Sequence, residues 1–414
     1  MHYRIQVQVL VTQQPTAAYP LRTKALLFRF IHSYEASDSW TELTNKARVV
    51  VPKNIKVKDQ YNKPFAMGGT NVNIGGFDTN APLFMIGDTI TIRAGYRYFD
   101  KQKNDVLGPT ESDGTLAIIF QGYISKVGSK IPIELDCEDN MWKLKQINAP
   151  NKTYKPTDTL ETIVSDMLQG TPFTVNDLTS TTFGAFRTQN ETVCEVLARL
   201  RKDYHLESYF RGTELRCGAV VYVEQDAIND GPKVFRFQYD ILDNYELDYK
   251  RKDDINLSCI AYSVNSVGQA STTKSGKTKT RQQRLEVLVS YQNGAFVRTV
   301  KPSGQAADYA PNTAGERRTF FFNNVTDVVA LGNLAEAQLS KYFYTGFRGH
   351  FTTFGIPLVK VGDNIDILDR KLPEKNGRYK CKSVEYSGGE GGLRQKISLD
   401  YLITRLDAKG NSIS

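Results

Sequence analysis

The sequence predicts a mainly β protein with a smaller α+β part, in which two related antiparallel β-barrel domains flank α+β middle domains. Strand-like alternation of apolar and polar residues fills both ends of the chain. Amphipathic helices lie between these ends, and one short turn-and-strand segment occurs twice. At 414 residues the chain is too long for one ordinary core, so these features indicate several domains.

Residues 1–147 have the pattern of consecutive strands. Period-two alternation or β-branched runs recur, and turn-rich stretches such as NKPFAMGGTNVNIGGFDTNAP separate them. This profile is typical of an antiparallel barrel or sandwich, where closure removes exposed strand edges. We therefore expect a first β-barrel domain over 1–147. Its expected strands are YRIQVQVLV, KALLFRFIHSY, TNKARVVVP, DTITIRAGY, LAIIFQGYISKV and IPIELDCED.

A small α+β domain of two helices and a hairpin is expected over residues 148–228. The first helix, in KPTDTLETIVSDMLQG, has an apolar stripe and an expected cap formed by Asp158 with Glu161. The second helix, in TQNETVCEVLARLRKDY, has Thr188 and Glu191 as a candidate capping box. HLESYFRGTELRCGAVVY then predicts two strands around a turn.

A β-rich middle domain is expected over residues 229–318, with strands in KVFRFQYD, NLSCIAYSV, RLEVLVSY and AFVRTV. Its segment 268–284 is basic, has no acidic residue and is almost free of apolar ones. We interpret it as a long, solvated, mobile loop. The alternative is a contact loop for a partner or a nucleic acid, carried by Lys274, Lys277, Lys279, Arg281 and Arg284.

The last expected domain, residues 319–414, combines a helix with a second β-barrel. TDVVALGNLAEAQLSKYFYT (326–345) has the apolar spacing of a helix, and Gly346 is its expected end. Strands separated by turns follow over 350–404.

The segment that occurs twice is MIGDTITIRAGY at 85–96 and KVGDNIDILDRK at 360–371. Each copy has a Gly-Asp pair, Gly87-Asp88 and Gly362-Asp363, in which the carboxylate is expected to bond its own backbone. The first copy is followed by GYISKV and IPIELD, and the second by GRYKCKSV and QKISLD. Three matching segments in one order favour two related β-domains; the alternative is chance recurrence of a short strand signature.

Two similar barrels in one chain have a geometric consequence. Three chains around an axis would present six quasi-equivalent barrels, so that a trimer could join a six-fold ring. Closed cyclic symmetry is the usual way in which soluble chains assemble.

Composition and motifs give no sign of catalysis, a metal or a cofactor. The scattered cysteines (Cys137, Cys194, Cys217, Cys259 and Cys381) lack the spacing of a zinc site or a disulfide framework. Motifs for hydrolases, metalloproteases and nucleotide binding are missing from the sequence. The net charge of +8 is spread along the chain, and no apolar run reaches the length of a membrane helix. The N-terminus also lacks a secretion signal.

Two further features have alternative interpretations. Asp136 and Glu138 in LDCEDNMW fall on one face of a strand and could form a carboxylate pair for glycoside hydrolysis. We interpret them instead as solvated residues at a strand end. The aromatic stretches RTFFFNNV and KYFYTGFRGHFTTFG could form a platform for sugars or bases, but we expect them to fill cores and interfaces.

The order of these features resembles the baseplate hub proteins of phage tails and related contractile injection systems. This family includes late-control-protein-D proteins, the Mu-like hub and the N-terminal part of the type VI secretion spike protein. The likeness covers roughly residues 35–405. It is carried by SWTELTNKARVVVPKN, FMIGDTITIRAGY, FQGYISKVGSKIPIELDCEDNMWKLKQ, TLETIVSDML, NETVCEVLARLRKDYHLESYFRG and FGIPLVKVGDNIDILDRKLPEKNGRYKCKSVEYSGGEGGLRQKISLDYLI.

The resemblance implies a non-enzymatic structural protein of the virion tail, assembled in the host cytoplasm. It implies a homotrimer whose six barrels form a pseudo-six-fold ring between the tail tube protein and the tip. The tape measure protein, and then DNA, would pass through the lumen. The chain ends at TRLDAKGNSIS without an appended spike or lysozyme-like module, so a separate spike or tip protein is expected.

Three alternatives remain open at the level of the sequence. One is a β-rich distal tail protein that binds receptor glycans through its aromatic residues. The second is a tail-tip cell-wall hydrolase. The third is a binder of single-stranded nucleic acid, which would show tight, salt-sensitive binding.

Overall fold

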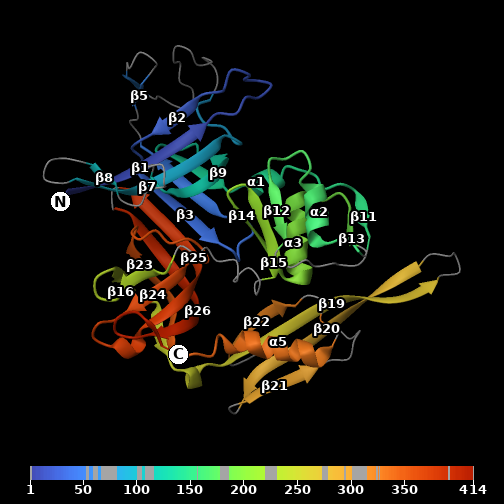
Figure 1. Cartoon of the computed structure of the whole chain (residues 1–414). Helices are drawn as coiled ribbons and strands as arrows, with labels where there is room; N and C mark the ends of the chain where they lie inside the picture. The colour runs from blue at the N-terminus through green and yellow to red at the C-terminus, as the bar shows by residue number, and fades with distance from the viewer. Residues whose placement is uncertain are drawn as a thin grey trace.

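The computed structural model confirms a mainly β protein with few helices (Figure 1). Nearly all strand pairs are antiparallel. Within the described part of the chain no helix is long and apolar enough to cross a membrane. The structure describes residues 2–52, 56–58, 64–66, 82–99, 105–107, 116–155, 157–177, 186–219, 231–272, 278–292, 295–300, 315–322, 325, 327–389 and 392–413.

The N-terminal strands form the first strand set, in which hydrogen-bonded neighbours follow the order β3-β4-β10-β9-β7-β1-β2. Alternation along these strands turns residues such as Val49, Ile92 and Leu135 into the core, as the sequence pattern predicted. The strands are β1 (His2–Thr12), β2 (Ala25–Phe28), β3 (Ser33–Ser39), β4 (Lys46–Val51), β7 (Thr89–Phe99), β9 (Ile118–Val127) and β10 (Ile133–Glu138), with the short β5 (Lys56–Lys58), β6 (Pro64–Ala66) and β8 (Asp105–Leu107).

The C-terminal strands form the second strand set together with three strands from residues 233–250. The sequence grouped those three strands with the middle domain, yet β16 pairs with β24, and β17 and β18 pair with β23. Phe235 explains this placement, because its buried ring packs edge-on against Phe351 with centroids 5.5 Å apart. The set comprises β16 (Lys233–Arg236), β17 (Ile241–Asp243), β18 (Leu247–Lys250), β23 (Gly346–Phe354), β24 (Asn364–Leu368), β25 (Gly377–Gly389), β26 (Arg394–Leu406) and β27 (Ser412–Ile413).

The two strand sets are joined edge to edge. Strand β25 pairs antiparallel with β3, from Ser383 opposite Ser39 to Gly389 opposite Ser33. This seam, as we call the β3–β25 pairing, makes one continuous sheet with one shared core. Among the described residues, hydrogen-bonded pairs do not close either set into a ring.

The α+β unit follows the first strand set along the chain and packs two helices against short strands. Both helices begin later than expected. Thr159, rather than Asp158, caps α2, and Thr192 with Glu195, rather than Thr188 with Glu191, forms the capping box of α3. The unit comprises α1 (Met141–Leu144), β11 (Lys152–Tyr154), α2 (Leu160–Met167), β12 (Thr174–Asp177), β13 (Phe186–Thr188), α3 (Val193–Tyr204), β14 (Leu206–Arg211) and β15 (Glu214–Ala219).

The expected caps fail because their side chains have other partners. The Asp158 carboxylate accepts from the backbone N–H of Lys155 at 2.8 Å, which stabilises the turn before α2. Thr188 lies in β13, and its hydroxyl donates to the carbonyl of Lys152 at 3.3 Å. When two candidate caps lie close together in the sequence, only such tertiary contacts decide which of them caps the helix.

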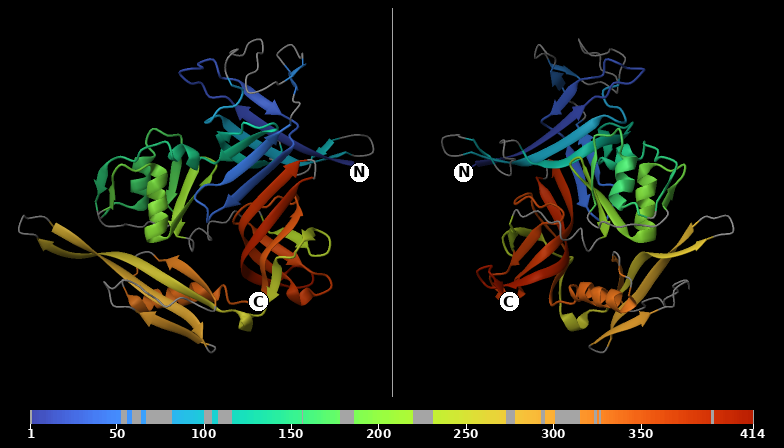
Figure 2. Two further views of the ribbon diagram at one scale, coloured as in Figure 1. Left: turned by 180° about the vertical axis from the view of Figure 1, so that it is seen from behind. Right: turned by 45° about the vertical axis from the view of Figure 1, so that its right-hand side comes forward.

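The middle unit is a four-stranded sheet covered by one helix. The prediction of a loop over residues 268–284 is wrong for the residues that the structure describes. They continue strands β19 and β20, which pair in a long hairpin. The paired strands extend away from the rest of the described chain (Figure 2). The elements are β19 (Leu257–Thr272), β20 (Thr278–Gln292), β21 (Ala295–Val300), β22 (Glu316–Phe321) and α5 (Val328–Ser340), with single 3₁₀ turns at η1 (Lys252–Asp254) and η2 (Pro373–Lys375).

Helix α5 is shorter than the 326–345 expected and belongs to this middle unit by packing. Asp327 caps it, its carboxylate accepting from the backbone N–H of Ala330 at 2.9 Å. Leu331, Ala335 and Leu339 are buried in the core of the unit, and the helix lies along β19 and β20. The sequence grouped this helix with the second barrel, because residue spacing shows which face is apolar but not which sheet covers it.

Candidate functional site

The repeated Gly-Asp segment forms a tight turn at the start of β7. Gly87 has φ +93°, a conformation that favours glycine, and its N–H donates to the carbonyl of Ile124 at 2.9 Å. The Ile124 N–H donates in return to the carbonyl of Asp88 at 2.9 Å. The Asp88 carboxylate accepts from the backbone N–H of Met85 at 2.8 Å.

The second turn repeats these hydrogen bonds one by one. Gly362 has φ +84° and donates to the carbonyl of Cys381 at 3.0 Å, and the Cys381 N–H donates to Asp363 at 2.9 Å. The Asp363 carboxylate accepts from the backbone N–H of Lys360 at 2.9 Å. The turns are therefore equivalent, and they equate Ile124 of β9 with Cys381 of β25.

The buried carboxylate of the first turn has further partners outside the turn. Asp88 pairs with the guanidinium of Arg22 through two contacts of 2.6 and 3.0 Å, and both side chains are buried. The same Asp88 also accepts from the backbone N–H of Gln14 at 2.9 Å. This carboxylate therefore ties β1, the 14–22 loop and β7 together, a role that residue spacing alone did not reveal.

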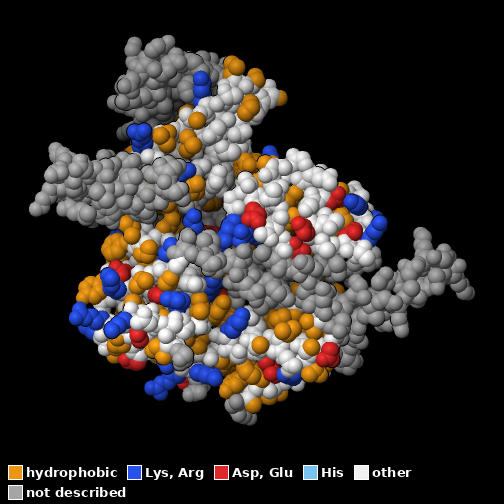
Figure 3. Space-filling view, viewed as in Figure 1, with side chains coloured by type: hydrophobic (Ala, Val, Ile, Leu, Met, Phe, Trp, Pro, Cys, Tyr) orange, Lys and Arg blue, Asp and Glu red, His pale blue; other side chains and the backbone are white. Residues whose placement is uncertain are grey.

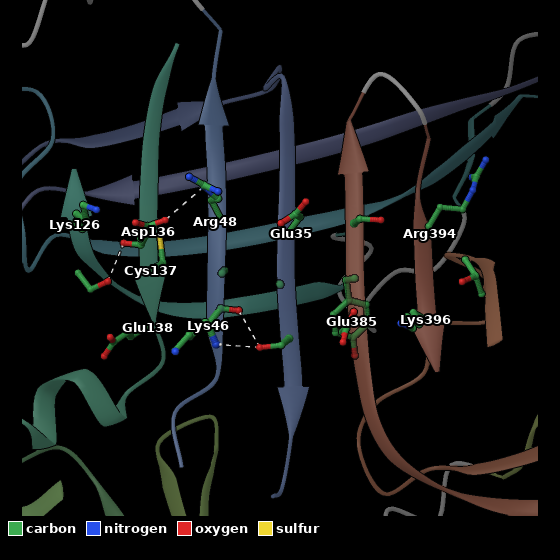
Figure 4. Close-up of a pocket in the computed structure, with 17 residues that line it drawn as sticks. Glu35, Lys46, Arg48, Lys126, Asp136, Cys137, Glu138, Glu385, Arg394 and Lys396 are labelled. Atoms are coloured by element: carbon green, nitrogen blue, oxygen red, sulfur yellow. Dashed lines mark hydrogen bonds and ion pairs between the residues drawn. The ribbon is translucent and has the colours of Figure 1, made fainter. Parts of the chain in front are cut away.

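Polar side chains gather on one face of the continuous sheet, across the seam. They line a hollow of about 940 Å³ that runs from β9 and β10, over β4 and β3, to β25, β26 and β23 (Figure 4). We call it the polar face. Its charged residues are almost balanced in sign, with cations at Lys46, Arg48, Lys126, Arg394 and Lys396 and carboxylates at Glu35, Asp136, Glu138 and Glu385.

The two carboxylates considered for glycoside hydrolysis lie on this face but have cationic partners. Arg48 contacts Asp136 at 3.6 Å and also pairs with Glu134. Lys145 contacts Glu138 at 2.6 Å. Both carboxylates are thus engaged in ion pairs with side chains of the same chain. The described residues also contain no cluster of His, Cys, Asp and Glu able to hold a metal ion.

A second acidic residue, Asp139, organises the joint between the first strand set and the α+β unit. Its carboxylate accepts from the backbone N–H of Asn45 at 3.1 Å and of Met141 at 2.9 Å. Burial raises the pKa of Asp139 to about 7, against the lowering effect of these hydrogen bonds. Its position directly before α1 was a signal in the sequence, but its burial was not.

The expected contact loop is described only in part. Lys274 and Lys277 lie outside the described residues, and Lys279 and Arg281 are placed by their backbone in β20. The Arg284 guanidinium stacks on the ring of Tyr262 at 4.1 Å, and its Nε lies 3.8 Å from Glu286. The contact-loop role stays a prediction for the other four residues, whereas Arg284 has partners within the chain.

The aromatic stretches proposed as a binding platform are mostly buried. Phe320, Phe321 and Phe322 lie in the core of the middle unit, and Phe347 and Phe351 lie in the core of the continuous sheet. On the surface of Figure 3, cationic and anionic side chains are interspersed over the second strand set. Neither feature offers a ready glycan site.

No protein-family model matches the chain, and no curated protein matches it in sequence. Solved structures do match. A tail protein from Neisseria meningitidis superposes with a TM-score of 0.50 at 12% identity, with 96% of each chain covered. The 43 kDa tail protein of prophage MuSo2 from Shewanella oneidensis gives 0.51 at 12% identity, with 95% of this chain and 98% of that chain covered.

This chain has the fold of phage tail proteins. The resemblance stated from the sequence is thus confirmed at the level of the fold. The matches cover nearly the whole length of this chain, so they extend over both strand sets and the α+β unit.

Proposed function

We propose that the protein is a structural baseplate hub of a phage tail or a related contractile injection system. One observation carries the proposal: the polar face is a single surface built from two halves of equivalent strands. The equivalent strand orders are β9-β10-β4-β3 and β25-β26-β23-β18, and all of these strands except β18 contribute residues to the polar face. The shared tail-protein fold supports the same conclusion.

Two equivalent halves in each chain suit a homotrimer with pseudo-six-fold symmetry. Three chains would place six halves around an axis, which matches a six-fold tube ring on one side. The polar face would then line the channel. Its nearly balanced charges would let a long polymer slide past, because a strongly cationic surface would hold nucleic acid by counterion release.

The partners follow from this arrangement. The tail tube protein would contact one side of the ring, and a separate spike or tip protein the other. The tape measure protein and DNA would pass through the lumen, and the hub would act in the virion tail without catalysis. The paired carboxylates and buried aromatic residues favour this hub over a hydrolase or a glycan-binding protein.

The first test is the absolute mass of the purified protein by light scattering over a concentration series. A mass of three times 46.6 kDa, rising to a plateau with concentration, is the expected result. Electron microscopy of that species should show a ring with a central channel. A monomer at every concentration, with or without the tail tube protein, would contradict the hub.

A further inference from the structure

The continuous sheet has two strand edges outside the seam, one at β18 and one at the β9–β10 hairpin. They correspond to the edges of β3 and β25 that pair with each other in the seam. We propose that β18 of one copy of the chain pairs with the β9–β10 hairpin of the next copy, repeating the pairing of β3 with β25. This assignment of the contact between copies rests on the trimer proposed above. It names the residues that meet, which the trimer alone does not.

The equivalence of the strands comes from hydrogen bonds within the chain. The turns equate Ile124 with Cys381, and hence β9 with β25. Strand β9 pairs with β10 as β25 pairs with β26, and β10 pairs with β4 as β26 pairs with β23. Finally, β4 pairs with β3 as β23 pairs with β18. Followed from Ile124 and from Cys381, these pairs lead to Ala36 and to Leu247, which therefore occupy the same place in this order, and both are buried.

Strand β18 differs from its counterpart β3 in how many of its edges are paired. In the seam, β4 covers one edge of β3 and β25 covers the other. Strand β18 pairs with β23 along one edge, and no other strand of the described chain pairs with it. A free strand edge is a template for another chain, which natural proteins usually cover.

Large apolar side chains are exposed close to both edges in sequence. Before β18, Tyr239, Leu242 and Tyr245 are 66%, 44% and 93% exposed. In the β9–β10 hairpin Ile131 is 59% exposed, and Ile86 in the neighbouring Gly-Asp turn is 61% exposed. Exposed apolar groups at both edges fit a contact that assembly buries.

The seam also predicts which residues meet. Ser387 of β25 lies opposite Glu35 of β3. The equivalence of Ile124 with Cys381 turns Ser387 into Lys130, and the equivalence of Ala36 with Leu247 turns Glu35 into Glu246. The pair therefore becomes Lys130 of one copy opposite Glu246 of the next. Both side chains are exposed and carry opposite charges. Opposite charges directly across an antiparallel pair stabilise it.

A cysteine pair tests the contact. In an antiparallel pair opposite Cα atoms lie about 4.5–5.5 Å apart, within the range of a disulfide. K130C/E246C should therefore form disulfides between copies under mild oxidation, giving bands of two and three linked chains on a denaturing gel. The five native cysteines are buried, so their background should be low. The control K130C/E374C, with an equally exposed second position, should stay unlinked.

Charge reversal gives an independent test. E246K should raise the protein concentration needed for trimer formation at least about tenfold, because like charges would face each other across the pair. Adding K130E should restore the trimer, and the melting temperature of each variant shows whether the subunit still folds.

The outcomes separate the two proposals. A trimer that neither cross-links at these positions nor responds to charge reversal would overturn the contact and leave the hub in place. Its free edge would then belong to another partner, such as the tail tube protein. A protein that never forms a trimer would overturn both.

Discussion

At the scale of single residues, a buried ion pair decides how the first Gly-Asp turn is held. The Asp88 carboxylate accepts two hydrogen bonds from Arg22 and two from backbone N–H groups. These four hydrogen bonds therefore all depend on one side chain. Removing one partner of a buried pair leaves the other charge without compensation. The turn is therefore a point where a single change should be felt throughout the first strand set.

We expect D88A to lower the free energy of unfolding by about 3–5 kcal/mol, because Arg22 would stay buried without its partner. The comparison is E134A, which removes an exposed ion pair with Arg48 and should change the free energy of unfolding by less than about 1 kcal/mol. Urea unfolding followed by circular dichroism measures both. Equal effects of the two substitutions would show that the buried pair has no special role.

The raised pKa of Asp139 predicts a dependence of stability on pH. An acid whose folded pKa, about 7, exceeds its unfolded value of 3.8 binds a proton more readily in the native state. The stabilisation that this carboxyl gives the folded state is fully present below pH 3.8, falls as the pH rises towards 7 and does not change further above pH 7. The free energy of unfolding should fall over this window by on the order of a few kcal/mol.

D139N should flatten this fall, as measured by urea unfolding at several pH values. Part of the slope should remain, because burial also raises the pKa of Glu207 to about 7. An unchanged slope in D139N would mean that Asp139 titrates as in the unfolded chain.

At the scale of elements, a stack of three side chains links the α+β unit to the middle unit. The ring of His205, at the end of α3, stacks on Tyr262 of β19 with centroids 5.0 Å apart. The Arg284 guanidinium of β20 stacks on the same ring. Together these contacts fix the base of the long hairpin against the helix.

We expect Y262L to loosen this joint, because leucine keeps apolar volume but loses both stacking contacts, worth about 1 kcal/mol. Hydrogen exchange of the described parts of β19 and β20 should become several-fold faster, whereas α2, in the α+β unit, should be unchanged. Y262F keeps the ring and serves as the control. Faster exchange in Y262F would point to the hydroxyl rather than to stacking.

The sequence predicted strands, helices and the repeated turn well, because alternation and helical spacing are local properties of the residues. It could not predict the seam, in which Ser39 meets Ser383 across most of the chain. Nor could it place β16–β18 or α5, because an apolar face does not specify its partner. Of the polar face, Asp136 and Glu138 were noticed, but the cations that neutralise them come from β4 and from the segment after α1.

At the scale of the whole molecule, the charge balance of the polar face should decide how the hub treats nucleic acid. The rival interpretation, a binder of single strands, needs a cationic groove. The polar face instead mixes five cations with four carboxylates. We therefore expect weak binding of single- and double-stranded DNA near 150 mM salt, with a shallow dependence on salt concentration.

Replacing two of these carboxylates should convert the face into a DNA-binding surface. E35K/E385K removes two negative charges and adds two positive ones on one face, raising the net charge of each chain by four, so binding should tighten and the log–log slope with salt should steepen. The control E161K/E374K adds the same charge at exposed positions outside the polar face. Fluorescence anisotropy with labelled DNA measures both variants. If the control tightens binding as much as E35K/E385K does, net charge rather than the polar face governs contact with DNA, and the channel lining must be sought elsewhere.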